Sequence, residues 1–196
     1  MNRAMWTAVR TCLVLTVLTG ILYPLAVWGA GRLFFASQAE GSLVVRNGRV
    51  IGSRLLAQAF HNPRYFHPRP SATDYDGTRS GATNLSPTSN RLVHGDPASH
   101  FLGVEQLAEQ VRRENNLPPN APVPVDAVTR SASGLDPAIS IAYANLQARR
   151  IARARGIGVA IVRECIAKAT TGRFLGIFGE PCVNVLKANL LLDNTR

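Results

Sequence analysis

The sequence has little of what metal sites and disulfide frameworks are built from. Only three of its 196 residues are cysteine, and none belongs to a Cys-x-x-Cys pair. Zinc sites are recognised by such spacings, so no metal ligand is predicted. Cys165 and Cys182 could form a disulfide in an oxidising compartment, although two buried free thiols are the interpretation that we favour.

Catalytic motifs are missing as well. The chain has no Gly-x-x-x-x-Gly-Lys-Ser/Thr loop for phosphates, no Asp-Lys-Thr-Gly aspartyl-phosphate site and no Gly-x-Ser-x-Gly elbow. Its carboxylates are few and dispersed, which does not indicate a general acid/base pair. The four histidines lack zinc-ligand spacing, and His67, between Phe66 and Pro68, is typical of a structural loop histidine. We therefore predict no catalytic residue.

Charge is absent from Thr11 to Gly31. As a helix this run spans roughly 30 Å, the thickness of the hydrocarbon core of a bilayer. A cleaved signal peptide would have a shorter apolar region and a small-x-small cleavage site, so we predict a retained transmembrane helix over residues 11–35. Gly20 favours close packing against a partner helix, Tyr23 suits the membrane interface and Pro24 would kink the helix.

The net charge is +10. Such a basic chain often binds nucleic acid, but the arginines are scattered and the chain is tethered, so anionic lipid or an acidic partner subunit fits better. Because a short N-terminal tail is easily left in the cytoplasm, we predict a cytoplasmic tail over residues 1–10 and an extracytoplasmic domain over 36–196. The charges that flank the span do not decide this topology alone.

The part of the chain after the membrane helix predicts a single α+β domain. Asn47-Gly48, between two β-branched runs, supplies the two positive φ angles of a type I′ hairpin turn. Asp136 followed by Pro137 is typical of a helix start. We expect the hairpin and the last strand to share a sheet, with the later helices on one face. The expected elements are a hairpin over 42–52, helices over 53–60, 102–115, 136–155 and 159–171, and strands over 123–125 and 183–193.

Residues 61–87 form a long segment with little periodicity, here named the motif loop. Its prolines exclude a long helix or a central strand, and its aromatic residues argue against disorder. We interpret it as an ordered functional surface. Backbone N–H groups of Ser80 to Asn84 could bind an anion or a partner loop, although a tight turn is the simpler interpretation. The Asp136 side chain would likewise occupy the N–H groups of the helix that we expect to follow it.

Several stretches together resemble the C subunit of Kdp-type potassium-transporting ATPases, and they cover nearly the whole chain. The run from Tyr65 to Ala72 is the most specific of them. The matching stretches are Thr19-Gly20-Ile21-Leu22-Tyr23-Pro24-Leu25, Gly52-Ser53 with Gln58-Ala59-Phe60, Tyr65-Phe66-His67-Pro68-Arg69-Pro70-Ser71-Ala72, Ser80-Gly81-Ala82-Thr83-Asn84-Leu85-Ser86-Pro87, Ser133-Gly134-Leu135-Asp136-Pro137 with Ile139-Ser140, and Gly179-Glu180-Pro181 with Val183-Asn184-Val185-Leu186.

The resemblance implies an accessory, non-catalytic subunit of a high-affinity, ATP-driven potassium uptake complex in the cell (inner) membrane. Its implied partners are a channel-like potassium subunit, a P-type ATPase subunit that hydrolyses ATP, and membrane lipid. No cofactor is expected to bind directly, and ATP is reached only through the complex. The implied functional loop comprises Tyr65, Phe66, His67, Pro68, Arg69, Ser80, Gly81 and Asn84.

The resemblance also implies roles in assembly and in raising the ATP affinity of the ATPase subunit, the latter assigned to Ser133, Gly134, Asp136 and Gln147. A domain outside the cytoplasm cannot touch ATP, so such an effect would travel as a coupling between states. The alternative is a domain that caps the potassium entrance. The chain departs from the family pattern at Ala82, Thr83, Ala138 and Cys182, which bears on the detailed loop geometry.

Two further hypotheses stay open. A membrane-anchored extracytoplasmic enzyme would use His67, Arg69 and Ser80 of the motif loop. A regulatory nucleotide-binding protein would need its domain in the cytoplasm, so the topology alone distinguishes it.

Overall fold

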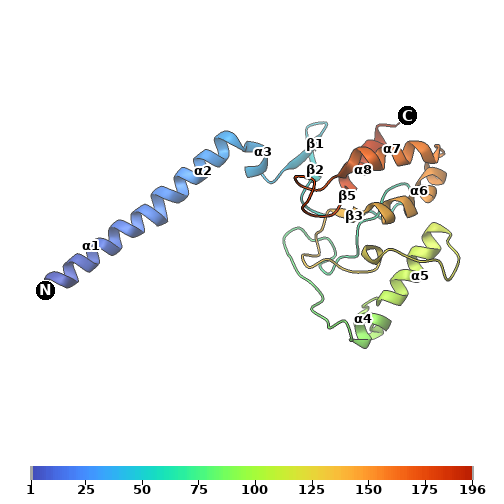
Figure 1. The fold of residues 1–196 in the computed structure, drawn as a ribbon, viewed down its shortest axis with the longest axis horizontal. Coiled ribbons are helices and arrows are strands. Elements are labelled where there is room, and N and C mark those ends of the chain that lie inside the picture. Colours follow the sequence, from blue (N-terminus) through green and yellow to red (C-terminus); the bar gives the residue numbers. More distant parts are fainter. Residues whose placement is uncertain (1, 196) are drawn as a thin grey trace. The chain divides into compact units, whose positions relative to one another are not determined.

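The computed structural model describes residues 2–195, and the chain divides into two compact units after Val44. In the first unit, α1 (Arg3–Val17), the π-helical turn η1 (Leu18–Leu22) and α2 (Tyr23–Phe34) form one continuous helix, and the short α3 (Ala36–Ala39) follows (Figure 1). None of the described residues of this helix is buried. The helix is long and apolar enough to cross a membrane, which confirms the predicted N-terminal membrane helix.

The π-helical turn lies directly before Pro24. At its end, the N–H group of Tyr23, the first residue of α2, donates to the carbonyl of Leu18, five residues earlier. Pro24 has no N–H group, so it cannot donate to the carbonyl of Gly20. The wider turn accommodates this missing bond, and the helix continues through the proline instead of ending there.

The hairpin of β1 (Leu43–Arg46) and β2 (Arg49–Ser53) follows, as a separate two-stranded sheet. Asn47 and Gly48 have φ angles of 53° and 74°, which confirms the predicted turn. The rest of the second unit carries α4 (Asn90–His94), η2 (Pro97–Ser99), α5 (Val104–Asn115), η3 (Val125–Ala127), β3 (Ala138–Ser140), α6 (Ile141–Arg155), α7 (Val159–Ala169), β4 (Thr170–Thr171), β5 (Cys182–Asn184) and α8 (Val185–Asp193).

A small antiparallel sheet of order β3-β5-β4 lies in the core of this unit. Val183 of β5 is opposite Ile139 of β3 and Thr170 of β4, and both Val183 and Ile139 are buried. Helix α7 contacts both α6 and α8, all three of these helices contact β5, and α5 packs against α6. The core also includes Phe66 of the motif loop and Leu192 of α8.

The fold class is confirmed as α+β with an N-terminal membrane helix, and α5 and α7 confirm two of the predicted helices. The prediction that the hairpin shares a sheet with the last strand is wrong, because the hairpin pairs only within itself in the described part of the chain. The strand predicted over 123–125 is also wrong, because Val125 begins the short 3-10 helix η3.

The helix predicted from Asp136 begins five residues later. Residues 138–140 pair with β5 as strand β3, and the hydroxyl of Ser140, not the carboxylate of Asp136, caps α6 by accepting from the Tyr143 N–H group at 3.0 Å. The local start signal was therefore overridden by strand pairing, a tertiary interaction.

The last element is mostly a helix instead of the predicted strand. Only Cys182–Asn184 are extended, and the Asn184 side chain then accepts from the Lys187 N–H group and caps α8. The helix predicted over 53–60 does not form either. There the Ser53 hydroxyl accepts from Leu55 N–H, and the Gln58 amide donates back to the carbonyl of Ile51 in β2.

Candidate functional site

The side chain of Gln147 holds the motif loop against helix α6. It is fully buried, and its Oε1 accepts from the backbone N–H group of His67 at 2.8 Å while its Nε2 donates to the carbonyl of the same residue at 3.1 Å. A single amide thus pairs both backbone groups of one loop residue, as a neighbouring strand would.

Asn189 of α8 does the same for the preceding loop residue. Its Oδ1 accepts from the Phe66 N–H group at 2.7 Å, and its Nδ2 donates to the Phe66 carbonyl at 3.0 Å. Phe66 is fully buried, so these backbone groups would lack partners without the amide. Two helices therefore fix two consecutive residues of the loop.

Arg150 joins the loop to α5. Its guanidinium group donates to the carbonyls of Pro63 and Tyr65 at 2.8 and 3.1 Å, and to Oδ1 of Asn115 at 3.1 Å. It also donates to Oε1 of Gln147 at 2.7 Å. The side chain is buried, and this burial lowers its pKa. A charge removed from water in this way requires such a full set of acceptors.

The imidazole of His67 completes the network. Nδ1 lies 3.3 Å from Oε2 of Glu114 and carries the proton of that hydrogen bond, because a carboxylate only accepts. Nε2 lies 3.3 Å from Nη1 of Arg150, which can only donate, and 3.2 Å from the carbonyl oxygen of Asn62, which can only accept. The hydrogen bond from His67 holds the pKa of Glu114 below its ordinary value. The ring is therefore engaged on both nitrogens and stabilises the loop.

A second contact joins the motif loop to the segment before β3. Nη1 of Arg69 lies 2.9 Å from Oδ2 of Asp136, whose Oδ1 accepts from the Ala138 N–H group at 3.0 Å. Arg69 also donates to the carbonyl of Thr129, and its own carbonyl accepts from the Tyr75 hydroxyl. Burial raises the pKa of Tyr75 to about 12, so the phenol remains a donor at neutral pH.

Ser80-Gly81 of the motif loop meets Ser133-Gly134 beside the Arg69–Asp136 pair. The Gly81 N–H group donates to the Ser133 carbonyl at 2.9 Å, and the Ser71 hydroxyl donates to the Gly134 carbonyl at 2.6 Å. Gly134 has a φ of +70°, and a Cβ atom there would lie 2.9 Å from the Gly81 carbonyl oxygen. Only glycine permits this approach. The Gly81 N–H group thus binds a carbonyl within the chain.

Arg69 and Asp136 together line two shallow grooves. The first, of about 610 Å³, also contains Ser80 and Ser133, and the second, of about 480 Å³, contains Asp126 and Cys182. His67 is not among the residues that line either groove. The structure therefore brings together only two of the three residues of the hypothetical enzyme.

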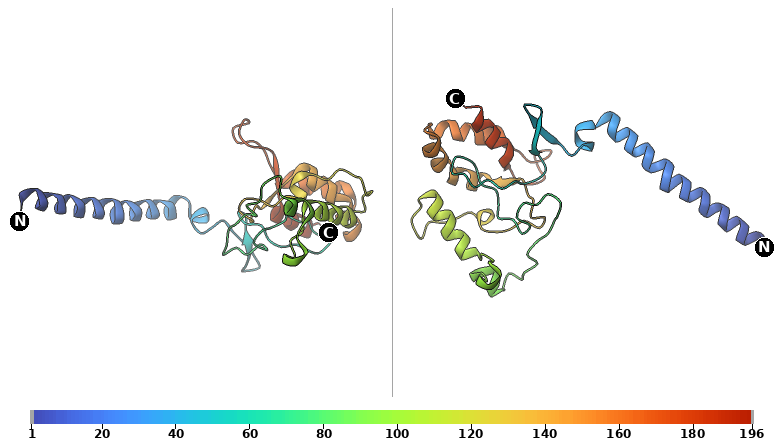
Figure 2. Two further views of the ribbon diagram at one scale, coloured as in Figure 1. Left: turned by 90° about the horizontal axis from the view of Figure 1, so that it is seen from below. Right: turned by 180° about the vertical axis from the view of Figure 1, so that it is seen from behind.

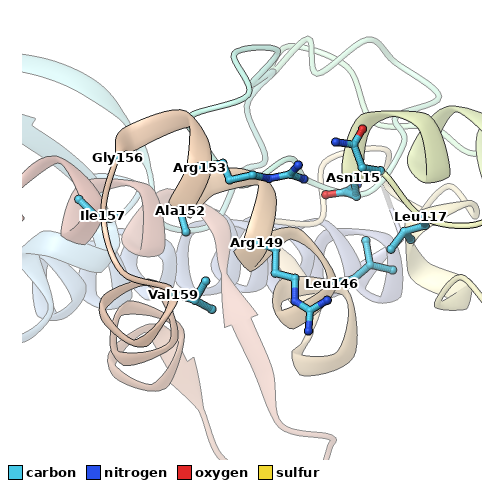
Figure 3. Close-up of a pocket in the computed structure, with 10 residues that line it drawn as sticks. Asn115, Leu117, Leu146, Arg149, Ala152, Arg153, Gly156, Ile157 and Val159 are labelled. Carbon is cyan, nitrogen blue, oxygen red and sulfur yellow. The ribbon is translucent and has the colours of Figure 1, made fainter.

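A third groove lies where α6 ends and α7 begins (Figure 3). Arg149 and Arg153 extend from the same helix as Leu146 and Ala152, and the described residues that line the groove include no carboxylate. Among residues 2–195, no three His, Cys, Asp or Glu side chains lie together in a group that could hold a metal ion.

Comparison with known proteins places the whole chain in one family. Residues 5–194 match the family model described as KdpC: K+-transporting ATPase, c chain. The chain belongs to the KdpC family. A "Potassium-transporting ATPase KdpC subunit" of Mycobacterium tuberculosis (strain ATCC 25618 / H37Rv) is 49% identical over 195 residues, 98% of this chain and 99% of the relative.

Other KdpC relatives agree. The protein of Myxococcus xanthus is 49% identical over 192 residues, 95% of this chain and 86% of the relative. That of Koribacter versatilis (strain Ellin345) is 43% identical over 198 residues, 100% of this chain and 97% of the relative. The predicted family is confirmed, and the chain is a subunit of the K+-transporting ATPase complex. Residues 2–195 include one candidate membrane helix.

Within this KdpC chain, the structure brings together most of the predicted site residues. Ser80, Gly81, Ser133 and Gly134 meet at the junction with the Arg69–Asp136 pair. Gln147 lies with Tyr65, Phe66 and His67 in the buried network, while Asn84 is exposed. The membrane residues Gly20, Tyr23 and Pro24 lie in the first unit, in or directly after the π-helical turn.

Sequence reasoning missed three residues of this network: Arg150 and Asn189, which bond the motif loop, and Asn115, which bonds Arg150. A signal for them existed. Each is a polar side chain on the apolar face of a helix, as with Asn189 between Ala188 and Leu192 in α8. A polar residue at such a position must find a partner inside the fold.

Proposed function

We propose that this chain is the accessory, non-catalytic subunit of a high-affinity potassium uptake complex, in which a partner subunit hydrolyses ATP. The observation that carries the proposal is that buried amides of Gln147 and Asn189 serve to fix consecutive residues of a surface loop. Core residues that immobilise a loop prepare it for binding, because the loss of freedom then occurs on folding and not on association.

The part of the motif loop offered to a partner is its polar half. Ser80 and Asn84 are exposed, whereas Phe66 and Pro68 are buried and position the backbone. We propose that this surface contacts the channel-like potassium subunit or the P-type ATPase subunit, that the domain lies outside the cytoplasm at the inner membrane, and that it covers the potassium entrance. The first unit meets lipid, and nucleic acid is no partner.

We further propose that an effect on ATP affinity acts by coupling through the complex. Gln147 is fully buried, and both atoms of its amide are engaged within the domain. Contact between this side chain and nucleotide would require the network to open. A change at Gln147 is therefore expected to alter ATP affinity only through the folding and docking of the domain.

The surface proposal is tested by pull-down of the complete complex from cells with Ser80→Arg in this chain. The bulky cation is expected to lower recovery of this subunit at least tenfold, since Ser80 is exposed at the proposed contact. The matched control is Ala160→Arg, at an exposed position of α7. Equal recovery of the two variants would show that the motif loop is not the contact surface.

The topology is tested separately. A cysteine at the exposed position Thr88, with Cys12, Cys165 and Cys182 replaced, is expected to react with an impermeant maleimide in intact cells. Labelling only after permeabilisation would place the domain in the cytoplasm. It would then favour the hypothesis of a regulatory nucleotide-binding protein.

A further inference from the structure

The hairpin that joins β4 to β5 ends in an exposed apolar tip. Four large apolar residues within residues 174–178 are 62–75% exposed: Phe174, Leu175, Ile177 and Phe178. In the left view of Figure 2 this hairpin projects from the rest of the second unit. We name residues 173–180 the apolar finger. Single exposed apolar residues are normal, but four within five positions indicate a contact site.

The finger has a defined conformation. Phe174 and Phe178 exchange two backbone hydrogen bonds of 2.8 and 3.0 Å, and Arg173 lies 3.0 Å from the carboxylate of Glu180 at the base. Because β4 and β5 belong to the core sheet, the base of the finger is continuous with the core. The tip is therefore presented in one shape.

Leu175 has a backbone conformation that is unfavourable for its own side chain. Its φ is 53° and that of Gly176 is 77°, so the two residues form a turn in which Asn or Gly would be strained less. The leucine is 75% exposed and adds little to the core of this chain. An exposed apolar residue in the left-handed region has no folding role here, which indicates that its side chain serves a contact.

The composition of the finger favours a protein socket over lipid. Interfacial membrane segments carry Trp, Tyr and unpaired Lys or Arg beside their apolar residues. The finger has none of these, since its one cation, Arg173, is paired with Glu180 and the charges cancel. A fluid bilayer also accepts an apolar tip in many conformations, whereas a shaped socket selects one. Paired aromatic and aliphatic anchors that enter a pocket are typical of protein interfaces.

We propose that the apolar finger inserts into an apolar socket on another subunit of the same transport complex. The proposal rests on the proposed function, because it requires this chain to assemble with partner subunits. The four apolar residues of the tip line neither of the grooves beside Arg69, although Glu180 at the base of the finger lines one of them. The contact of the tip and the contact of the motif loop can therefore fail independently. A socket that closes around Phe174, Leu175, Ile177 and Phe178 would exclude water from all four side chains at once.

The test uses the full chain, co-expressed with the other subunits, and the variant Leu175→Asn. Asparagine tolerates a positive φ and is polar, so the resistance of the domain to urea is expected to stay the same or rise. Recovery of this subunit with a tagged ATPase subunit is expected to fall at least tenfold. A purely structural role for Leu175 predicts the opposite, with a less stable domain. The matched control is Val125→Ser, another exposed apolar position, which should leave recovery unchanged.

The same variants distinguish the other possible binding partners of the finger. Recovery equal to that of Val125→Ser would overturn the proposal. If recovery is unchanged but flotation of the free subunit with phosphatidylethanolamine–phosphatidylglycerol vesicles falls in Leu175→Asn, the finger binds lipid instead. If only concentration-dependent sedimentation of the free subunit changes, it binds a second copy. If the unaltered subunit is itself not recovered with the ATPase subunit, the proposed function fails, and this proposal with it.

Discussion

Replacement of Gln147 with alanine removes the amide that joins α6 to the motif loop. It leaves the N–H and carbonyl groups of His67 and one N–H group of Arg150 without their partner. A buried polar group without a partner costs about 1–3 kcal/mol. Since Arg150 keeps its other bonds and water can enter the vacated space, we expect the free energy of unfolding to fall by about 3–6 kcal/mol. Ordinary domains have stabilities of about 5–15 kcal/mol, so a loss of this size would bring a domain at the lower end of that range close to unfolding.

Two variants separate the causes of this loss. Asn145→Ala lies on the same helix, where the exposed amide donates only to the carbonyl of Ile141, and should change stability by no more than about 0.5 kcal/mol. Gln147→Met keeps the volume of the side chain and removes its hydrogen bonds, so it should lose most of the same free energy. If the cavity were the cause, Gln147→Met would be nearly as stable as the unaltered chain.

The assay must report on the second unit alone. Both tryptophans, Trp6 and Trp28, lie in the membrane helix, so their fluorescence does not follow the domain. Cys165 is a buried free thiol of α7, and burial raises its pKa, which makes it slow to react until the domain unfolds. Pulse labelling of Cys165 across a urea series, in detergent and with Cys12 and Cys182 replaced by serine, gives the unfolding midpoint. A midpoint of Gln147→Ala equal to that of Asn145→Ala would refute the reasoning.

The remaining predictions use the same assay. Gly134→Ala and Gly156→Ala both place alanine at a φ of +70°, which lowers the free energy of unfolding by about 1–2 kcal/mol. Only Gly134→Ala also brings a Cβ atom within 2.9 Å of a carbonyl oxygen, so its free energy of unfolding should fall by about 1–3 kcal/mol more. Equal losses in the two variants would contradict the close approach. The lowered pKa of Glu114, held down by its hydrogen bond from His67, stabilises the fold above the ordinary value of 4.5, and this contribution is lost as the pH falls through the lowered pKa. In Glu114→Gln, the free energy of unfolding should therefore fall less steeply with pH below about pH 4.5. The control Glu109→Gln, on the exposed side of the same helix, should keep the slope of the unaltered chain. Identical acid profiles for the two variants would exclude the proposed role of the Glu114 carboxylate.

Several features of the chain depend on local chemistry and were predictable from it. The uncharged run from Thr11 to Gly31 predicts a membrane helix because only length and polarity decide that a helix fits a bilayer. Asn47-Gly48 predicts its turn because these two residues accept positive φ angles at low cost. The motifs of residues 65–72 and 80–87 predicted the family, which the comparisons confirm.

The sequence also indicated that the motif loop is ordered, but it did not show how. Prolines and aromatic residues exclude regular structure and argue against disorder, and both are local properties. The amides that pair with the loop come from α6 and α8, which are 80 and more residues distant in the sequence. Residues so far apart in the sequence share no helical or strand periodicity. The sequence therefore does not show that Asn189 and Arg150 bond the motif loop, and only the folded domain does.

What the sequence determined by itself is therefore whatever depends on neighbouring residues: the membrane helix, the hairpin turn, the helices α5 and α7, and the order of the motifs. The tertiary structure determined the conformation of those segments in which strand pairing or long-range hydrogen bonds compete with the local preference of the residues. Residues 138–140 became a strand because β5 offered backbone partners, although Asp136-Pro137 favours a helix at that point. Residues 185–193 became a helix because that conformation buries Leu186 and Leu192 while directing the Asn189 amide to the motif loop. A buried backbone group must be paired somewhere, and the position of its partner is known only once the chain has folded.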